Sequence, residues 1–93
     1  MRPYTKADII SVDPGQIGVY GLFKGTRAIY IGSGDIFARL IGHLTGDNTC
    51  ISRHEPDSWT ASVTGPDSDP TVREAELISE YTPACNRRVF SGQ

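Results

Sequence analysis

The strongest constraint on the fold is a change of hydrophobic period at Ser33-Gly34-Asp35. Before this point, residues 17–23 and 28–31 are rich in β-branched and aromatic types, with a glycine-containing turn between them, which predicts a β-hairpin. After it, apolar residues recur at helical spacing until Gly46, which predicts an amphipathic helix over 36–44. The regular structure is therefore expected to begin as a hairpin followed directly by a helix.

The second half of the chain adds a strand and a helix. Residues 59–64 alternate large or apolar side chains with small or polar ones, as a half-exposed strand does. Asp69-Pro70 is typical of an N-cap with proline in the first turn, and it predicts a helix that ends near Pro83. Residues 47–58 are polar and predict a long surface loop, and residues 86–90 predict a short extended tail.

These elements predict an α/β (α+β) fold, a small three-stranded, mainly antiparallel sheet flanked by helices. A chain of 93 residues can build one core only, so a single domain over 1–93 is expected. Glycines inside the strands, Gly18, Gly21 and Gly32, indicate either close approach by another chain or a ligand, or β-bulges.

Composition limits the classes of protein that the chain can belong to. A hydrophobic fraction of 38% with 22% charged residues is that of an ordinary globular protein. The sequence shows neither a run of ~18 apolar residues nor a secretory leader, so we expect a cytoplasmic protein with no membrane partner. The net charge of −2 disfavours unaided, tight DNA binding, because Lys and Arg supply most of the non-specific affinity. Cations gather between residues 18 and 54, which indicates either a modest basic face or merely solvated helices.

The two cysteines, Cys50 and Cys85, are too few for a disulfide framework, and in the cytoplasm they are expected to stay reduced. The alternative is a metal site in which His54 and His43 join them. The sequence lacks the paired CxxC…HxxxH form of a zinc site, so reduced, half-buried cysteines are favoured.

Two tripeptides of the predicted hairpin carry a family resemblance. Gly18-Val19-Tyr20 and Tyr30-Ile31-Gly32 resemble the paired signature of the GIY-YIG nucleases. The rest of that family's pattern follows in order, first as Arg39 and His43, one turn apart on the next helix. It ends as a Glu-x-x-Leu-Ile-x-x-x-x-Pro-x-x-Asn run, present over 74–86. The resemblance thus covers a motif-bearing core of residues 18–86, and the family's three-stranded domain agrees with the fold predicted above.

The resemblance implies a divalent-metal-dependent DNA endonuclease in which a tyrosine, Tyr20 or Tyr30, activates water. Glu74 would be the single protein ligand of Mg²⁺ or Mn²⁺, ions that one carboxylate, waters and substrate phosphate commonly hold. Arg39 and His43 would bind the transferring phosphate. Asn86 would fix the geometry of the site.

Each of these residues also has an ordinary structural role open to it. A strand tyrosine is usually a buried aromatic with a satisfied hydroxyl, an Arg and a His four apart are usually an exposed pair, and an Asn after a helix is usually a turn residue. A Glu in the first turns of a helix often serves only the helix dipole. Glu76 lies about 200° around the helix from Glu74 and is expected to be dispensable.

The chain departs from the family pattern at two places. Ser33 stands where many members carry Lys, which removes one cation. The interval from Tyr30 to Arg39 is one residue shorter than is common, most simply around Gly34-Asp35, so the helix must start at a different angle. Loop cations can replace the missing charge, and the predicted substrate-binding residues are Gly32, Ser33, Arg53 and His54.

Two rival functions remain open from the sequence. One is a non-catalytic nucleic-acid- or protein-binding module on a degenerate GIY-YIG fold, and the other is a small structural protein without a nucleic-acid role. Family members usually gain specificity from an attached DNA-binding domain, which a single domain over 1–93 is not expected to include. A homodimer or a separate DNA-targeting partner is therefore expected.

Overall fold

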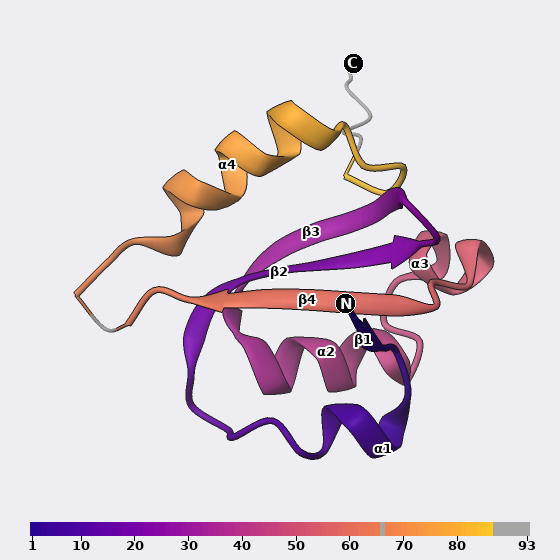
Figure 1. The fold of residues 1–93 in the computed structure, drawn as a ribbon, viewed down its shortest axis with the longest axis horizontal. Helices are drawn as coiled ribbons and strands as arrows, with labels where there is room; N and C mark the ends of the chain where they lie inside the picture. Colours follow the sequence, from indigo (N-terminus) through magenta and orange to yellow (C-terminus); the bar gives the residue numbers. More distant parts are fainter. Residues whose placement is uncertain (66, 87–93) are drawn as a thin grey trace.

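The computed structural model describes residues 1–65 and 67–86 (Figure 1). The elements in chain order are β1 (Arg2–Pro3), α1 (Lys6–Ile9), β2 (Ile17–Lys24), β3 (Arg27–Asp35), α2 (Ile36–Leu44), α3 (Thr49–His54), β4 (Ser58–Val63) and α4 (Pro70–Tyr81).

The strands form one antiparallel sheet in the order β1-β4-β2-β3. The predicted fold class is confirmed, with four strands in place of three because the two-residue β1 pairs with the start of β4. The tail predicted over 86–90 lies, apart from Asn86, outside the described residues. In the part of the chain that is described, no helix has the length and apolar character needed to span a bilayer.

Helices cover both faces of the sheet. In Figure 1, α1 and α2 lie on one side of it and α4 on the other. The main core forms on the α1 and α2 side from Ile9, Tyr20, Leu22, Ile36, Leu40, Ile51 and Trp59. On the other side α4 buries no residue fully, and its Tyr81 meets Phe23 edge-on at 6.0 Å between ring centroids. The helix α4 is therefore the more weakly held layer.

Strand β3 passes into α2 without a loop. Asp35 ends the strand and caps the helix, since its carboxylate accepts a hydrogen bond from the Ala38 amide at 3.2 Å. Gly34 has φ +126°, a conformation that glycine adopts without strain. This is the place where the sequence is one residue short, and the direct junction sets the helix angle.

The loop predicted over 47–58 is wrong, because it contains the helix α3. The Asn48 side chain caps α3 by accepting from the amides of Cys50 and Ile51 at 3.0 and 3.2 Å. Ile51 is only 1% exposed and anchors the helix in the core. A single anchoring apolar residue gives no helical period, so periodicity could not reveal this element.

The prediction that the cysteines stay reduced is also wrong for this structure. Cys50 of α3 and Cys85, beyond α4, form a disulfide with their Cα atoms 5.7 Å apart. The segment after α4 runs along the free edge of β3, where Cys85 donates its amide to the Ile29 carbonyl at 2.7 Å. This pairing carries Cys85 to α3, and composition contains no sign of it.

The strand glycines have a neighbour that the sequence did not indicate. A Cβ atom on Gly18 would collide with the Ser62 carbonyl of β4, and one on Gly21 would collide with the Phe23 ring. Other atoms therefore do approach the backbone closely at both positions, but they belong to the chain's own sheet and not to another chain or a ligand. The irregular register between β2 and β3 falls elsewhere, between Leu22 and Phe23.

Candidate active site

Three aromatic rings from three elements meet on the α2 side of the sheet. The ring centroids of Tyr20 on β2 and Tyr30 on β3 lie 6.2 Å apart. The ring centroid of His43 on α2 lies 5.6 Å from that of Tyr20 and 5.0 Å from that of Tyr30. Tyr20 is 2% exposed and His43 is 4% exposed. The fold thus brings together one residue from each of three successive elements.

Gly32 makes room for this aromatic cluster. It is the cross-strand partner of Tyr20, so both residues face the same side of the sheet. A Cβ atom at Gly32 would collide with the hydroxyl and ring of Tyr20 and with the ring of Tyr30. Packing around Tyr20 therefore requires glycine here, whatever contact Gly32 makes with a substrate.

His43 is hydrogen-bonded at both ring nitrogens. Nε2 lies 2.7 Å from the Tyr20 hydroxyl, and Nδ1 lies 2.8 Å from Oδ1 of Asp47. Asp47 was not among the candidates from the sequence, because it falls in the segment expected to be a loop. Its spacing of four residues from His43 was the available signal.

Arg39 lies beside the tyrosines in spite of the shortened interval before it. The neighbouring Tyr20 and, to a smaller extent, Tyr30 raise the pKa of Arg39. Burial raises the pKa of Tyr20 above its ordinary value, Arg39 counteracts this rise, and the charges of Tyr30 and Glu74 add to it. Tyr20 is therefore a neutral phenol at rest, with a cation and a carboxylate in electrostatic reach.

Glu74 joins the site from α4. Asp69 caps this helix, with Pro70 in its first turn, and Glu74 is half-buried against the sheet. Ser33 at the end of β3 donates a hydrogen bond to Oε1 of Glu74 at 3.0 Å. Glu76 is exposed and pairs with Arg73 at 3.2 Å, in agreement with the expected separation of the two glutamates.

Asn86 lies on the backbone of β3 between the two signature residues. Its Oδ1 accepts from the Ile31 amide and its Nδ2 donates to the Ile31 carbonyl, each at 2.8 Å. This pairing continues the edge contacts of the two preceding residues with β3. Asn86 therefore fixes the strand that carries Tyr30 and Gly32.

Arg53 and His54 lie in the last turn of α3, away from this cluster. Arg53 is exposed, and His54 donates from Nδ1 to the Cys50 carbonyl at 2.9 Å. His54, Asn86 and Arg27 line one hollow beside the end of α4. No described hydrogen bond or ion pair connects Arg53 or His54 with Tyr20, Tyr30, Arg39, His43 or Glu74.

The four-residue metal site considered from the sequence does not form in the described structure. Ligand atoms of Cys50, His54 and Cys85 lie within 4.8 Å of one another. The two sulfurs are bonded to each other rather than free as thiolates, and His43 belongs to the aromatic cluster. The disulfide accounts for this convergence.

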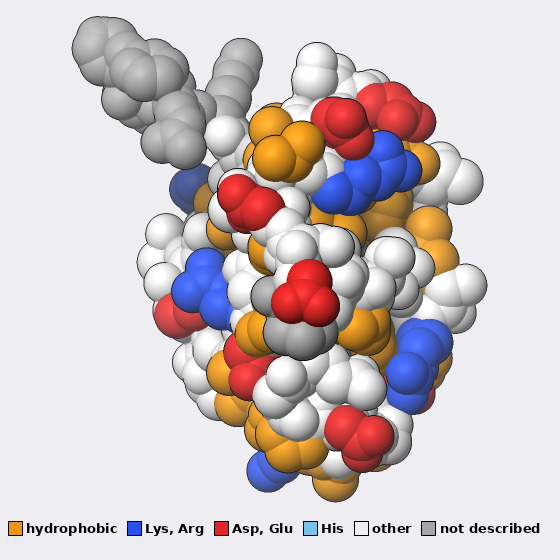
Figure 2. Space-filling model, turned by 90° about the vertical axis from the view of Figure 1, so that its left-hand side faces the viewer, with side chains coloured by type: hydrophobic (Ala, Val, Ile, Leu, Met, Phe, Trp, Pro, Cys, Tyr) orange, Lys and Arg blue, Asp and Glu red, His pale blue; other side chains and the backbone are white. Residues whose placement is uncertain are grey.

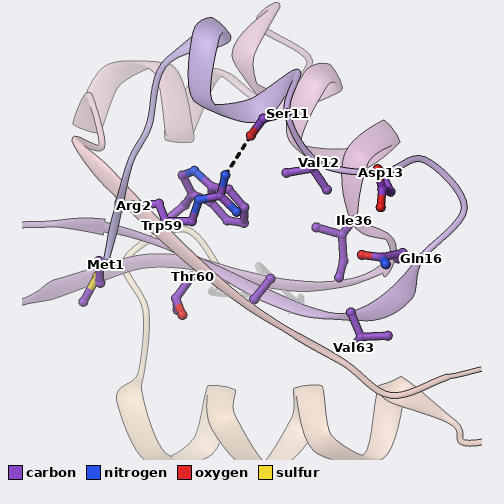
Figure 3. A pocket seen from close by; sticks show the side chains of 11 residues that line it. Met1, Arg2, Ser11, Val12, Asp13, Gln16, Ile36, Trp59, Thr60 and Val63 are labelled. Atoms are coloured by element: carbon purple, nitrogen blue, oxygen red, sulfur yellow. Dashed lines mark hydrogen bonds between the residues drawn. The ribbon is translucent and has the colours of Figure 1, made fainter.

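A separate hollow of about 370 Å³ lies between β4 and the N-terminal segment (Figure 3). Arg2 lies over the Trp59 ring at 4.7 Å and donates to Ser11 at 2.8 Å. Asp8 accepts from the Trp59 indole at 2.9 Å and pairs with Arg2 at 3.0 Å. These groups satisfy one another's hydrogen-bonding capacity and hold the N-terminal segment against β4. None of the candidate catalytic residues lines this hollow.

No family model matches the chain, and neither does any curated protein. Solved structures of the GIY-YIG N-terminal endonuclease domain of UvrC from Thermotoga maritima are similar over nearly the whole chain. A point mutant bound to its catalytic divalent cation has 27% identity and a TM-score of 0.75, covering 90% of this chain and 100% of that one. The magnesium-bound domain has 27% identity and a TM-score of 0.74, covering 89% and 100%.

Proposed function

Because the chain has the GIY-YIG fold, we propose that it is a divalent-metal-dependent DNA endonuclease that hydrolyses phosphodiester bonds with a tyrosine-activated water. The observation that carries the proposal is the convergence of Tyr20, Arg39 and Glu74 within electrostatic reach of one another. The similar UvrC domain was solved with its catalytic cation, which supports a metal role for this site.

Glu74 suits a hard divalent cation. It is a half-buried carboxylate that Ser33 orients through Oε1, and oxygen is the ligand that Mg²⁺ and Mn²⁺ prefer. One carboxylate with waters and a substrate phosphate is an ordinary magnesium environment. When bound, the ion would supply positive charge beside the reacting phosphate.

The chain's own residues would bind the phosphate and position the reacting groups. Arg39 presents a planar fork of donors that matches phosphate oxygens and stabilises the charge that develops on them. Asn86 holds β3, and with it Tyr30 and Gly32, in a fixed position. We place Ser33 and Gly32 near the substrate, with Arg53 and His54 as more distant contacts to DNA.

The charges on the surface favour weak DNA binding that a second copy of the chain or a partner protein directs. Figure 2 shows Lys and Arg side chains separated by acidic and uncharged ones on the end of the molecule where α4 begins. With a net charge of −2, few phosphates can be neutralised at once. A homodimer or a DNA-targeting partner would supply the missing affinity. The proposal includes a cytoplasmic location, which requires the Cys50–Cys85 disulfide to persist in a compartment where most cysteine pairs are reduced.

Nicking of supercoiled plasmid tests the proposed function. We expect the purified protein to cut with Mg²⁺ or Mn²⁺ and to stop with EDTA. Glu74→Ala should abolish cutting, while Glu76→Ala, on the same helix but outside the site, should cut like the unaltered protein. Folded protein that cuts neither plasmid, branched nor single-stranded DNA with either ion would contradict the proposal.

The second candidate is a binding module that has lost turnover. The specific observation in its favour is Ser33, which leaves the site without the cation that many GIY-YIG nucleases carry there. This candidate predicts DNA retention that weakens as salt rises, with no cutting at any metal concentration. Retention and cutting measured on the same sample distinguish the two functions.

A further inference from the structure

We propose that Asp47 is a positioning residue that fixes the tautomer of His43, so that His43 receives the Tyr20 proton and Tyr20, not Tyr30, activates the water. The inference rests on the proposed nuclease function and adds the route of the proton. Nothing in the family pattern of the sequence indicates Asp47.

The hydrogen bonds define the tautomer. An ionised carboxylate only accepts, so Nδ1 of His43 must carry the proton that lies between it and Asp47 at 2.8 Å. In the neutral ring Nε2 then has a lone pair, and the Tyr20 hydroxyl at 2.7 Å donates to it. The oxygen of Tyr20 lies beside the Arg39 guanidinium and has two lone pairs, so one can accept from Arg39 while the other takes a proton from water.

The chain is shaped to bring Asp47 under the imidazole. Gly46, with φ +97°, turns the backbone after α2, and the Asp47 amide then donates to the Gly42 carbonyl at 3.1 Å. A Cβ atom on Gly42 would lie 2.8 Å from Oδ2 of Asp47, so glycine leaves room for the carboxylate. Both glycines therefore serve this contact.

The imidazole has little freedom to choose another partner. His43 is 4% exposed and is packed by the rings of Tyr20 and Tyr30. Tyr30 meets it edge-on, at an interplanar angle of 68°, through its ring. The hydroxyl that is hydrogen-bonded to the imidazole is that of Tyr20, and this difference selects Tyr20 as the water-activating residue.

The other titratable groups around His43 leave Asp47 as its anionic partner. Tyr4 and Glu55 line a hollow together with His43, and Arg39 lies one turn earlier on α2. Burial and the charge of Asp47 raise the pKa of Tyr4 to about 12, so Tyr4 stays neutral. Glu55 is exposed, and the described contacts place no carboxylate other than Asp47 within hydrogen-bond distance of the ring.

In the proposed hydrolysis the two proton transfers are concerted, so no free Tyr20 phenolate forms. As the water oxygen bonds to phosphorus, the water proton passes to Tyr20 while the Tyr20 proton passes to Nε2 of His43. The bond from phosphorus to the leaving oxygen breaks, and that oxygen takes a proton from solvent. Asp47 compensates the positive charge of the imidazolium, which then returns its proton to solvent.

Nuclear magnetic resonance on the metal-free protein tests the positioning role directly. The sequence has two histidines, so His54→Gln assigns the ring signals of His43. We expect His43 in the Nδ1-protonated form, and we expect Asp47→Ala to shift the proton toward Nε2. Asp13→Ala, an exposed aspartate outside the site, is the control. An unchanged tautomer in Asp47→Ala would overturn the proposal.

Plasmid nicking provides the second readout. Asp47→Ala should lower kcat by about 10–100-fold and leave KM unchanged, as loss of a partner that orients a histidine does. Adding Asp47→Ala to His43→Ala should cost nothing further, because the two act as a unit. Additive losses, or a loss confined to KM, would overturn the inference. Absence of cutting by the unaltered protein would contradict the proposed function instead, and the tautomer would still decide what Asp47 does.

Discussion

The Ser33 hydroxyl donates to Oε1 of Glu74 across 3.0 Å and thereby joins the end of β3 to α4. The helix α4 buries no residue fully, so this hydrogen bond is one of the few polar contacts that set the position of Glu74. A residue that first looks like the loss of a cation therefore has a role of its own, which is to orient the candidate metal ligand.

Replacing Ser33 by Ala should weaken metal binding. The carboxylate of Glu74 would lose its orienting donor, and loss of such a partner typically costs 10–100-fold in metal affinity. Calorimetric titration with Mn²⁺, together with the metal dependence of plasmid nicking, measures the effect. Ser52→Ala, on the exposed side of α3, is the matched control. Equal Mn²⁺ affinity in the two variants would show that the hydrogen bond does not matter.

Replacing Gly32 by Ala should destabilise the protein and disturb the site together. The new Cβ would overlap the hydroxyl of Tyr20 and the ring of Tyr30, and overpacking of this kind costs about 1–3 kcal/mol. Urea unfolding measures the loss, with Ser79→Ala on the exposed face of α4 as a control expected to stay within about 0.5 kcal/mol. A Gly32→Ala protein of unaltered stability would mean that the aromatic cluster can shift.

Local signals in the sequence were sufficient for most of the fold, and they supplied most of the residues of the candidate site. The hairpin, α2, β4 and α4 each have their own period or capping residue, and the structure contains all of them. Arg39 and Glu74 became candidates because their spacing follows a family pattern, and their catalytic roles stay predictions. These are properties of short stretches of chain, which a single sequence displays.

The features that sequence reasoning missed depend on contacts between distant segments. The helix α3 has Ile51 as its one fully buried residue, and its disulfide exists because the segment before Asn86 follows the edge of β3. Asp47 reaches His43 because Gly46 reverses the chain. A backbone turn and an edge pairing leave no period in the sequence, so only the folded structure reveals them.

Removing the disulfide should lower the free energy of unfolding. Cys50 and Cys85 close a loop across 35 positions, and a link of that length stabilises by roughly 2–4 kcal/mol. Urea unfolding of the protein with both cysteines changed to Ser measures this, with the unaltered protein under reductant as the comparison. Alkylating free thiols in intact cells, before lysis exposes the protein to air, shows whether the disulfide forms inside the cell. Free thiols in the purified, folded protein would contradict the pairing.

Replacing Tyr4 by Phe should stabilise the protein. The Tyr4 hydroxyl is buried without a hydrogen-bond partner in the described part of the chain, and such a group costs about 1–3 kcal/mol. Burial, with the charge of Asp47, raises the pKa of Tyr4 from 10.0 to about 12. The folded state therefore holds a proton that the unfolded chain releases above pH 10, so stability present below pH 10 is lost as the pH rises toward 12.

Unfolding measured at neutral pH and between pH 10 and 12 checks both parts of the Tyr4 prediction. Tyr4→Phe should be the more stable protein at neutral pH, and its stability should fall less steeply in the alkaline range. Tyr81→Phe is the control, because its side chain is 46% exposed and its hydroxyl is not confined to the core. A loss of stability in Tyr4→Phe at neutral pH would show that the hydroxyl has a partner in solution, and water bridging to Asp47 would then be the contact to examine.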